Sequence, residues 1–380
     1  MLAVGLMSGT SLDGVDTVLC EISGQDESTR VKQLHFKTYE IPEHLRSKIR
    51  KCCSRECIPV DLICSLNFEL GYLFADAVKS LCQDANVKLE DLSFIASHGQ
   101  TIFHIPKVYD DYVPSTLQIG EAAIIANECK TKVISNFRVM DMAVGGEGAP
   151  LVPYSETLLY SEEDQAVALQ NIGGIGNVTV LPKKGDAKKV IAFDTGPGNM
   201  MIDEAVRTLY GKKYDTDGYY ARQGNLIPSL AEELKIHPYF NLEIPKTTGR
   251  EMFGEHFTKS ILEKYHSCEP NDLIHTFTWF TAYSIVYHYK KYLISEYDLK
   301  KCIIGGGGAY NSYLLELIKN EMPEVTVMTQ EEHGFSSEAK EALAFVILGN
   351  QTYHRRPSNV PSATGAKKSV ILGQITYPTL

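Results

Sequence analysis

The turn MSGTSLDGVD (residues 7–16) lies between an apolar run, Leu2 to Leu6, and a run of β-forming residues, Val15 to Ile22. This order predicts a β-hairpin whose tip is rich in Gly, Ser and Thr. Such a tip presents backbone N–H groups and hydroxyls with little side chain in front of them, which suits a phosphate. An Asp in the same turn could hold a metal ion or orient a nucleophile beside that phosphate. An ordinary hairpin turn has the same composition, so the functional interpretation depends on the rest of the chain.

A second glycine-rich hairpin opens the second half of the chain. The strand expected at 167–170 runs into the turn NIGGIGN (171–177), and a return strand is expected at 178–182. A later strand ends in the turn GGGGAYN (305–311), which precedes a helix expected at 312–320. Two such hairpins facing each other would hold a polyphosphate from both sides, and the four-glycine turn would let a flat ring such as adenine approach the backbone.

The order of elements predicts an α/β fold with mixed sheets and helices on their faces. We expect two duplicated RNase H-like domains of the actin-like ATPase and sugar-kinase type, with an ATP cleft between them. The first domain takes residues 1–136 with 354–380, and the second takes 137–353. In the first half, strands are expected at 2–7, 15–22, 33–41, 94–97 and 132–136, and helices at 43–54, 61–86 and 120–130. A late strand is expected at 369–372.

Composition excludes several classes of protein. The chain carries 37 Lys and Arg against 47 Asp and Glu, so we expect no nucleic-acid partner. No run is apolar enough for a membrane span, although the helix expected at 271–293 comes nearest. Nine cysteines without zinc-ligand spacing favour reduced thiols, and no basic segment precedes the first apolar run as in a signal peptide. We therefore expect a cytoplasmic protein with no membrane partner.

Ordered sequence blocks resemble the anhydro-N-acetylmuramic acid kinase family. The turn at 7–16 resembles the opening signature of that family, and further blocks follow in family order over nearly the whole chain. Chance agreement of so many ordered blocks is negligible beside that of a single motif. The further blocks are SHGQT (97–101), QIGE (118–121), NFR (136–138), GGEGAPLVP (145–153), NIGG (171–174), FDTGPGN (193–199), GGGGAYN (305–311) and EALAF (341–345).

The resemblance implies a function. The family phosphorylates 1,6-anhydro-N-acetylmuramic acid with ATP and opens its anhydro ring with water, which gives N-acetylmuramic acid 6-phosphate in peptidoglycan recycling. A related branch, the levoglucosan kinases, acts on 1,6-anhydroglucose, and that substrate stays open for this chain. A different class, an actin- or chaperone-like ATPase without a sugar substrate, is the other alternative. The resemblance also implies a homodimer, with ATP and Mg²⁺ as cofactors.

The resemblance further implies catalytic and nucleotide-binding residues. Asp194 matches the family's catalytic carboxylate, which would take a proton from the water that attacks the anomeric carbon; capping of the next helix is the alternative. Glu341 is implied as an Mg²⁺ ligand, and a solvated helix glutamate is the alternative; its apolar neighbours at 342–345 predict a buried setting that requires a partner for the carboxylate. Asp13 is a second candidate for the metal, or a turn-stabilising residue. The residues expected to bind ATP are Gly9, Thr10, Ser11, Leu12, Asp13, Gly14, Val15, Asp16, Gly173, Gly174, Gly306, Gly307, Gly308 and Asn311.

Two further residues match positions around the sugar pocket. Arg138 would bind the lactyl carboxylate of a muramyl sugar through two parallel hydrogen bonds. His98 is either a sugar ligand or a structural histidine. Glu147 departs from the family pattern, in which we expect a neutral amide more often. A negative charge near a carboxylated substrate is unfavourable, so the identity of the anhydrosugar stays open.

Overall fold

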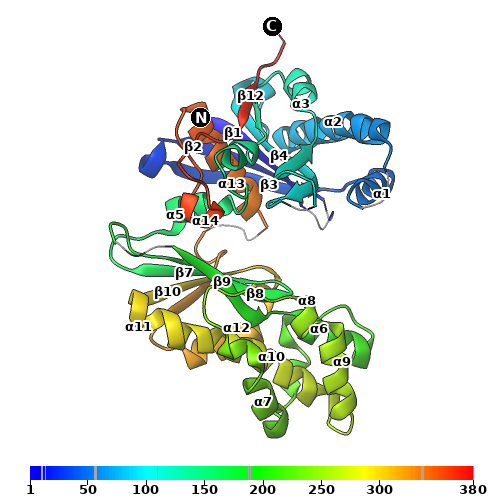
Figure 1. The fold of residues 1–380 in the computed structure, drawn as a ribbon, viewed down its shortest axis with the longest axis vertical. Coiled ribbons are helices and arrows are strands. Elements are labelled where there is room, and N and C mark those ends of the chain that lie inside the picture. The colour runs from blue at the N-terminus through cyan, green and yellow to red at the C-terminus, as the bar shows by residue number, and fades with distance from the viewer. Residues whose placement is uncertain are drawn as a thin grey trace. The chain divides into compact units, whose positions relative to one another are not determined.

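The chain folds into two compact units. The computed structural model describes residues 1–9, 12, 14–54, 58–108, 110–186, 188, 190–334 and 338–379. The first unit comprises Met1–Leu159 with Glu338–Leu380, and the second comprises Tyr160–Ser337 (Figure 1). The sequence placed these boundaries at 136/137 and 353/354 instead. The second of these boundaries differs because helix α13 (Lys340–Tyr353) packs on the sheet of the first unit.

The first unit is built on a mixed sheet in the order β12-β6-β4-β1-β2-β3, with β5 paired to β4. The first three strands form an antiparallel meander, whereas β4 runs parallel to β1 and β6 runs parallel to β4. The strands are β1 (Leu2–Ser8), β2 (Val15–Ser23), β3 (Arg30–Tyr39), β4 (Leu92–Ile105), β5 (Ser115–Ile119), β6 (Val133–Ser135) and β12 (Gln374–Thr376). The helices are α1 (Glu43–Cys52), α2 (Val60–Asp84), α3 (Ala122–Cys129), α4 (Val139–Ala143), α5 (Val152–Tyr160), α13 and α14 (Pro361–Thr364).

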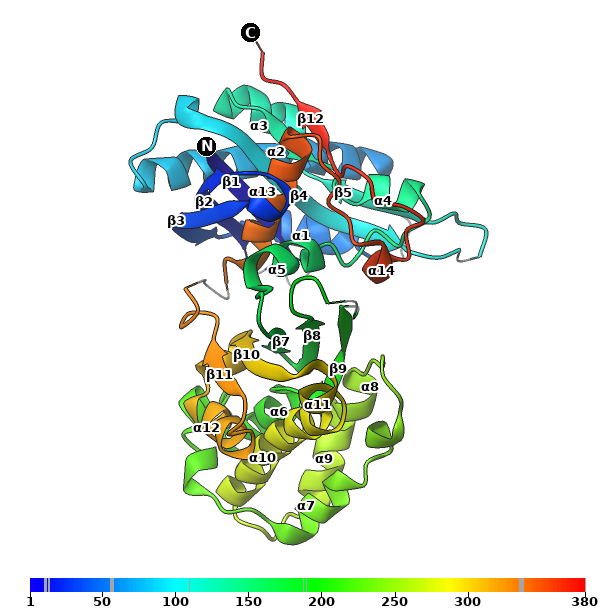
Figure 2. The same cartoon turned by 90° about the vertical axis from the view of Figure 1, so that its left-hand side faces the viewer.

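Alternation along β1 assigns helices to the two faces of this sheet, because successive strand residues point to opposite faces. Val4 and Leu6 are buried in a core cluster that also contains residues of α1, α2 and α3. Gly5 points to the other face, where an added Cβ would lie 2.1 Å from the main-chain oxygen of Ala342 in α13. Only glycine permits this approach. Helix α13 therefore covers one face, and α2 and α3 cover the other, as can be followed in Figure 2.

The second unit repeats the topology of the first. Its sheet has the order β11-β10-β7-β8-β9, in which β7, β8 and β9 form an antiparallel meander and β10 and β11 continue in parallel. The chain order and strand directions match those of β1, β2, β3, β4 and β6, so the predicted duplicated RNase H-like fold is confirmed. The strands are β7 (Ala166–Ile172), β8 (Ile175–Leu181), β9 (Ile191–Pro197), β10 (Leu299–Gly305) and β11 (Thr326–Thr329). The helices are α6 (Met200–Tyr210), α7 (Pro228–Lys235), α8 (Arg250–Phe253), α9 (Glu255–Lys264), α10 (Pro270–His288), α11 (Ile294–Tyr297) and α12 (Ser312–Glu321).

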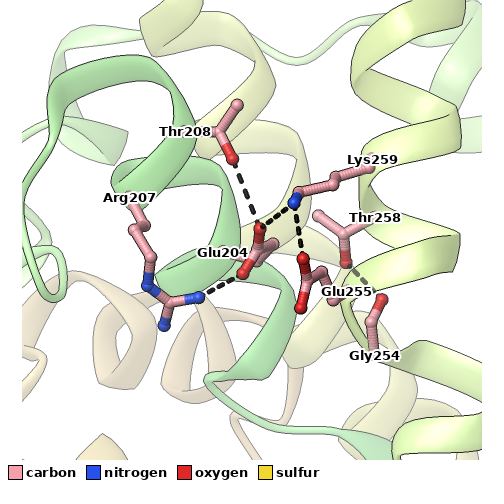
Figure 3. Close-up of polar contacts among 7 residues, drawn as sticks. All are labelled: Glu204, Arg207, Thr208, Gly254, Glu255, Thr258 and Lys259. Atoms are coloured by element: carbon pink, nitrogen blue, oxygen red, sulfur yellow. Dashed lines mark hydrogen bonds and ion pairs between the residues drawn. The ribbon is translucent and has the colours of Figure 1, made fainter.

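Helix α10 joins two parts of the second unit's core. Ile285 packs with the sheet, whereas Phe277 packs with a helical cluster that includes residues of α6, α7 and α9. At the edge of that cluster, the buried Glu204 of α6 pairs with Arg207 and lies 3.7 Å from Lys259 of α9 (Figure 3). Two cations thus compensate the buried carboxylate, and the cluster fastens α6 to α9.

Three elements differ in particular from the sequence expectations, while the ends of several others move by one to three residues. The strand expected at 94–97 extends over Leu92–Ile105, because its far end pairs with β5. The helix expected at 271–293 stays α-helical only to His288, and Tyr289–Leu293 form a π-helical turn. The late strand lies at Gln374–Thr376 instead of 369–372, because these residues pair with β6. Within the described ranges, no helix combines the length and apolar character that a membrane span requires.

Candidate functional site

The tip of the β1–β2 hairpin is held by a glutamine from β4. Strand pairing runs up to Ser8 opposite Val15. Gln100 is buried; its Oε1 accepts the Ser8 hydroxyl at 2.6 Å, and its Nε2 donates to the Gly9 main-chain oxygen at 3.4 Å. Leu12 has a φ of +60°, and its side chain lies in the core with that of Val15. Leu12 and Val15 were both predicted to bind ATP, but because their side chains are buried only their main-chain atoms can face a phosphate.

The remaining residues of this tip divide into described and undescribed positions. Thr10, Ser11 and Asp13 lie outside the described residues. Gly14 packs against β3, where an added Cβ would lie 2.4 Å from Thr38 Cγ2, so packing alone already requires this glycine. Asp16 Oδ1 accepts a hydrogen bond from the Thr38 hydroxyl at 2.6 Å.

Glu341 lies in the first turn of α13, near Asp16. Desolvation by the surrounding protein, followed by the Asp16 carboxylate, raises the pKa of Glu341, whereas Lys340 and Arg138 lower it. The following residues, 342–345, are buried, as predicted, whereas Glu341 itself reaches solvent while enough protein surrounds its carboxylate to raise its pKa. Two carboxylates that repel each other suit a divalent cation with oxygen ligands. No group of three or more potential ligands occurs among the described residues, which do not include Asp13.

The structure brings His98 and Arg138 into direct contact. The buried His98 ring donates from Nδ1 to the Gly99 main-chain oxygen at 2.8 Å, and its Nε2 accepts from Arg138 Nη2 at 2.9 Å. This assignment follows because a guanidinium can only donate. Burial, and then the Arg138 charge, lowers the pKa of His98 to about 3. His98 is therefore a neutral acceptor that orients Arg138.

The Arg138 guanidinium has a second anchor. Its Nη1 donates to the main-chain oxygen of Gly148 at 2.8 Å. The loop that carries Gly148 is itself held by Asp141, whose Oδ2 accepts from the Gly148 N–H at 2.9 Å. A guanidinium carries more N–H groups than these contacts use, so it can still donate to a ligand carboxylate.

A pocket of about 340 Å³ in the first unit lies beside His98. Much of its lining is polar, with side chains from α2, β5, the start of α3 and the end of β6: Asn67, Gln118, Glu121 and Asn136. Two buried atoms of the lining, Ser97 Oγ and Gln118 Oε1, have no hydrogen-bond partner within the part of the chain that the structure describes. Buried polar atoms of this kind require a ligand or water. The pocket therefore suits a ligand rich in hydroxyl groups.

Asp194 lies next to a bulge in β9. Asn177 opposes Asp194 and Gly176 opposes Gly196, so Thr195 is the extra residue, and such bulges re-aim the neighbouring side chains. Asp194 Oδ2 accepts from the Thr248 main-chain N–H at 2.8 Å. Burial raises the pKa of Asp194, and the Thr248 N–H lowers it in part.

The alternative role of Asp194 as a helix cap is wrong. The residue at the N-cap of α6 is Asn199, and Asp194 lies within the preceding strand. Among the described residues, none donates a hydrogen bond to Asp194 Oδ1. One oxygen of the half-buried carboxylate is thus fixed, and the other remains open to a ligand or water.

At the tip of the β7–β8 hairpin, packing does not require either of the two glycines. The nearest atom to an added Cβ would lie 3.7 Å away at Gly173 and 3.5 Å away at Gly174. Their main-chain oxygens accept from the N–H groups of Asn199 and Gly198, which ties the β9–α6 turn to the hairpin. Because packing does not demand glycine at either position, the missing side chains leave room for a ligand.

The glycine turn after β10 borders a second pocket, of about 460 Å³. An added Cβ would lie 2.5 Å from Asn171 Oδ1 at Gly306, which has a φ of +81°, and 2.3 Å from Ile172 Cγ2 at Gly308. The fold therefore requires both glycines. Gly307 lines the pocket, and its nearest neighbour would be 3.6 Å away, so packing does not explain its lack of a side chain.

The rest of the lining of this pocket includes two tyrosine rings, two amides and three carboxylates. Tyr310, Asn311, Asp203, Asp215 and Asp217 all line it. Asn311 also caps α12, because its Oδ1 accepts from the Leu314 N–H at 3.0 Å. Burial raises the pKa of Asp203 to about 6; Arg207 lowers it and Asp215 raises it further.

Sequence reasoning missed several of these residues. Gln100 belongs to the SHGQT block, but nothing in the sequence places it under the Gly9 turn. Thr248 acts through its main-chain N–H, which no residue type reveals. Asp203 follows Asn199 at helical i+4 spacing, which places both residues on one face of α6. This spacing could have indicated that Asp203 lines the same pocket as Asn199.

A family model and named relatives match the chain over its length. The family model described as "Anhydro-N-acetylmuramic acid kinase" matches residues 1–378. A protein of Clostridioides difficile (strain 630) with this name is 57% identical over 376 residues, which cover 99% of this chain and 98% of the relative. A protein of Bacillus cereus (strain AH187) with the same name is 52% identical over 382 residues, which cover 100% of both.

Solved structures with a similar trace are distant. The activator of the 2-hydroxyisocaproyl-CoA dehydratase from Clostridium difficile, solved with bound ADPNP, is 11% identical with a TM-score of 0.43 and covers 91% of this chain and 93% of its own. A ROK family protein from Streptococcus pneumoniae TIGR4, solved with sucrose, is 12% identical with a TM-score of 0.39 and covers 93% of this chain and 100% of its own.

Proposed function

Because the chain belongs to the anhydro-N-acetylmuramic acid kinase family, we infer that it uses ATP to phosphorylate 1,6-anhydro-N-acetylmuramic acid. The substrate and ATP are small molecules, and the product of this reaction is N-acetylmuramic acid 6-phosphate, an intermediate of peptidoglycan recycling. The observation that carries the chemistry is the half-buried Asp194 carboxylate with one oxygen fixed and one open.

We assign the role of general base to Asp194. Its Oδ1 takes a proton from the water that attacks the anomeric carbon of the sugar. As the anhydro C–O bond breaks, O6 gains negative charge and attacks the γ-phosphorus of ATP, whose bond to the β,γ-bridging oxygen breaks to release ADP. A base works best when its pKa lies near the operating pH, and burial moves the pKa of Asp194 in that direction. The Thr248 N–H keeps the carboxylate in one orientation.

We assign sugar binding to the first unit. The polar pocket beside His98 offers unpaired buried oxygens for sugar hydroxyls. Arg138, oriented by His98 and Gly148, is the partner for the lactyl carboxylate. Glu147 pairs with Lys107 at 3.0 Å, which offsets the negative charge that made this position unfavourable in the sequence.

We assign the nucleotide to the glycine-rich turns. In the second unit, Gly307, Asn311 and Tyr310 would contact the nucleoside, and Gly173 and Gly174 would leave their backbone open to the phosphates. In the first unit, the β1–β2 tip with Gly9 and Gly14 would meet the γ-phosphate. Asp16 and Glu341 would hold Mg²⁺, which neutralises phosphate charge when bound.

Other parts of the functional assignment remain predictions. We expect a homodimer, which sedimentation equilibrium would test. We also expect a cytoplasmic location, which suits the free thiols of the eight cysteines that the structure describes. Levoglucosan stays the alternative substrate, and an ATPase without a sugar substrate is the alternative of another class.

Product analysis separates these alternatives. The enzyme is incubated with ATP and either 1,6-anhydro-N-acetylmuramic acid or levoglucosan in ¹⁸O-labelled water, and products are identified by mass spectrometry. We expect phosphorylated muramic sugar with the heavy atom on the anomeric hydroxyl. Label in the phosphate, with no phosphorylated sugar, would support the ATPase instead. A phosphorylated product from levoglucosan but not from the muramyl sugar would identify levoglucosan as the substrate, as in the related branch.

A further inference from the structure

Lys246 is a buried ammonium group that the proposed reaction does not use. The residue is 6% exposed, and its Nζ donates to the main-chain oxygens of Tyr239 at 3.0 Å and Leu242 at 3.1 Å. Nζ also lies 4.4 Å from the centroid of the Tyr239 ring. Among the described residues, no carboxylate forms an ion pair with it. Burying a charge without a counter-ion costs free energy, so the position requires an explanation.

The segment that Lys246 closes holds Asp194 at three atoms. The Asp194 N–H donates to the Lys246 main-chain oxygen at 2.9 Å. The Thr248 N–H donates to Asp194 Oδ2 at 2.8 Å, and the Tyr239 hydroxyl donates to the Asp194 main-chain oxygen. Every described hydrogen bond to the Asp194 carboxylate therefore comes from the segment 239–248.

We propose that Lys246 is a positioning residue for the kinase reaction, which clamps the segment 239–248 so that the Thr248 N–H stays on Asp194 Oδ2. The clamp is direct, because the ammonium joins the start of the segment, at Tyr239 and Leu242, to its end. The inference rests on the proposed role of Asp194 as the general base.

The clamp has a consequence for proton transfer. The Thr248 N–H lowers the pKa of Asp194, so loss of this bond raises it. The ionisable groups around Lys246 are Glu243 in its own segment, Lys291 on the π-helical turn and His288 on α10. Burial, and then the Lys291 charge, lowers the pKa of Lys246 to about 8, and Glu243 raises it. The ammonium is thus charged over the acidic range in which Asp194 titrates.

The test compares Lys246→Met with Lys291→Met. Methionine keeps an unbranched side chain that is one atom shorter and removes the N–H donors, and Lys291 is an exposed lysine that does not touch Asp194. For Lys246→Met we expect kcat to fall about 10- to 100-fold, as for a misplaced catalytic group, with the KM for ATP within about twofold. The acidic limb of the kcat–pH profile shifts to higher pH. Lys291→Met retains the wild-type profile.

The outcomes separate this inference from the proposed function. An inactive Asp194→Asn together with an unshifted acidic limb in Lys246→Met overturns the positioning role alone. An active Asp194→Asn overturns the general base and the positioning role together. If Lys246→Met does not fold, Lys246→Gln, which keeps one donor group, takes its place; we expect a smaller shift in the same direction, and an unshifted limb again overturns the inference.

Discussion

At the scale of single residues, the Asp194 carboxylate offers only Oδ1 to a nucleophile, because Thr248 N–H occupies Oδ2. Asp194→Asn keeps the size of the side chain and removes the base. We expect kcat to fall by at least about 10²–10⁴-fold, the usual cost of losing a general base. ATP binding, measured by calorimetry, stays unchanged. Glu243→Gln, a substitution at an exposed position of the segment 239–248, serves as the control. A near-native rate in Asp194→Asn would show that Asp194 is not the general base.

Arg138 distinguishes the two candidate sugars, because only the muramyl sugar carries a carboxylate. Arg138→Ala removes a charged hydrogen-bonding partner worth roughly 1.5–3 kcal/mol. We expect kcat/KM to fall about 10- to 150-fold for the muramyl sugar and far less for levoglucosan. Equal losses for both sugars would mean that Arg138 serves the fold through Gly148 and His98 instead.

Glu341 and Asp16 are the described carboxylates assigned to Mg²⁺. Glu341→Gln keeps one oxygen and removes the charge that a hard cation prefers. We expect the Mg²⁺ concentration for half-maximal rate to rise. Because the raised pKa of Glu341 means that the folded protein disfavours its charged form, we expect the neutral amide not to lower the free energy of unfolding. An unchanged Mg²⁺ titration would leave Asp16 and Asp13 as the carboxylates to examine.

At the scale of elements, the turn after β10 separates glycines that the fold requires from one that it does not. Gly306→Ala forces a Cβ to within 2.5 Å of Asn171 Oδ1 at a φ of +81°, so we expect a lower unfolding temperature. Gly307→Val meets no such contact but enters the pocket. We expect weaker ATP binding by calorimetry and an unchanged unfolding temperature. Unchanged ATP affinity in Gly307→Val would place the nucleoside elsewhere.

The sequence predicted which strands and helices occur better than it predicted their first and last residues. Glycine-rich turns and β-forming runs located both hairpins, because short-range patterns determine such turns. The extension of β4 to Ile105 and the position of β12 depend on pairing with β5 and β6, which are long-range contacts. At the site, block resemblance supplied Asp194, His98 and Arg138, but not Thr248 or Lys246. Their contacts use main-chain atoms and a loop closure that no residue type encodes.

At the scale of the whole molecule, each unit buries a neutral histidine. Burial, and then Arg138, lowers the pKa of His98 to about 3, and burial chiefly lowers that of His288 to about 4. An unfolded histidine titrates near 6.5, so the unfolded chain binds these protons at a higher pH than the native one. The contribution to stability is therefore complete above pH 6.5 and is lost as the pH falls towards the native values. Asp203 acts in the opposite sense, because its native pKa is raised to about 6.

The histidines and Asp203 change the stability in opposite directions as the pH falls. The direction of the histidine effect is therefore tested by comparing a variant with the wild type. His288→Phe removes the proton site and fits the surrounding aromatic rings of Phe193, Tyr239 and Phe240. The single tryptophan, Trp279, lies on the same helix α10, so its fluorescence during urea unfolding reports on the second unit. Between pH 6.5 and about 4, we expect the loss of unfolding free energy on acidification to shrink by up to about 1.4 kcal/mol per pH unit relative to wild type. His256→Phe, at an exposed position, should leave the slope unchanged. The same slope in His288→Phe and wild type would show that His288 does not carry this part of the acid sensitivity.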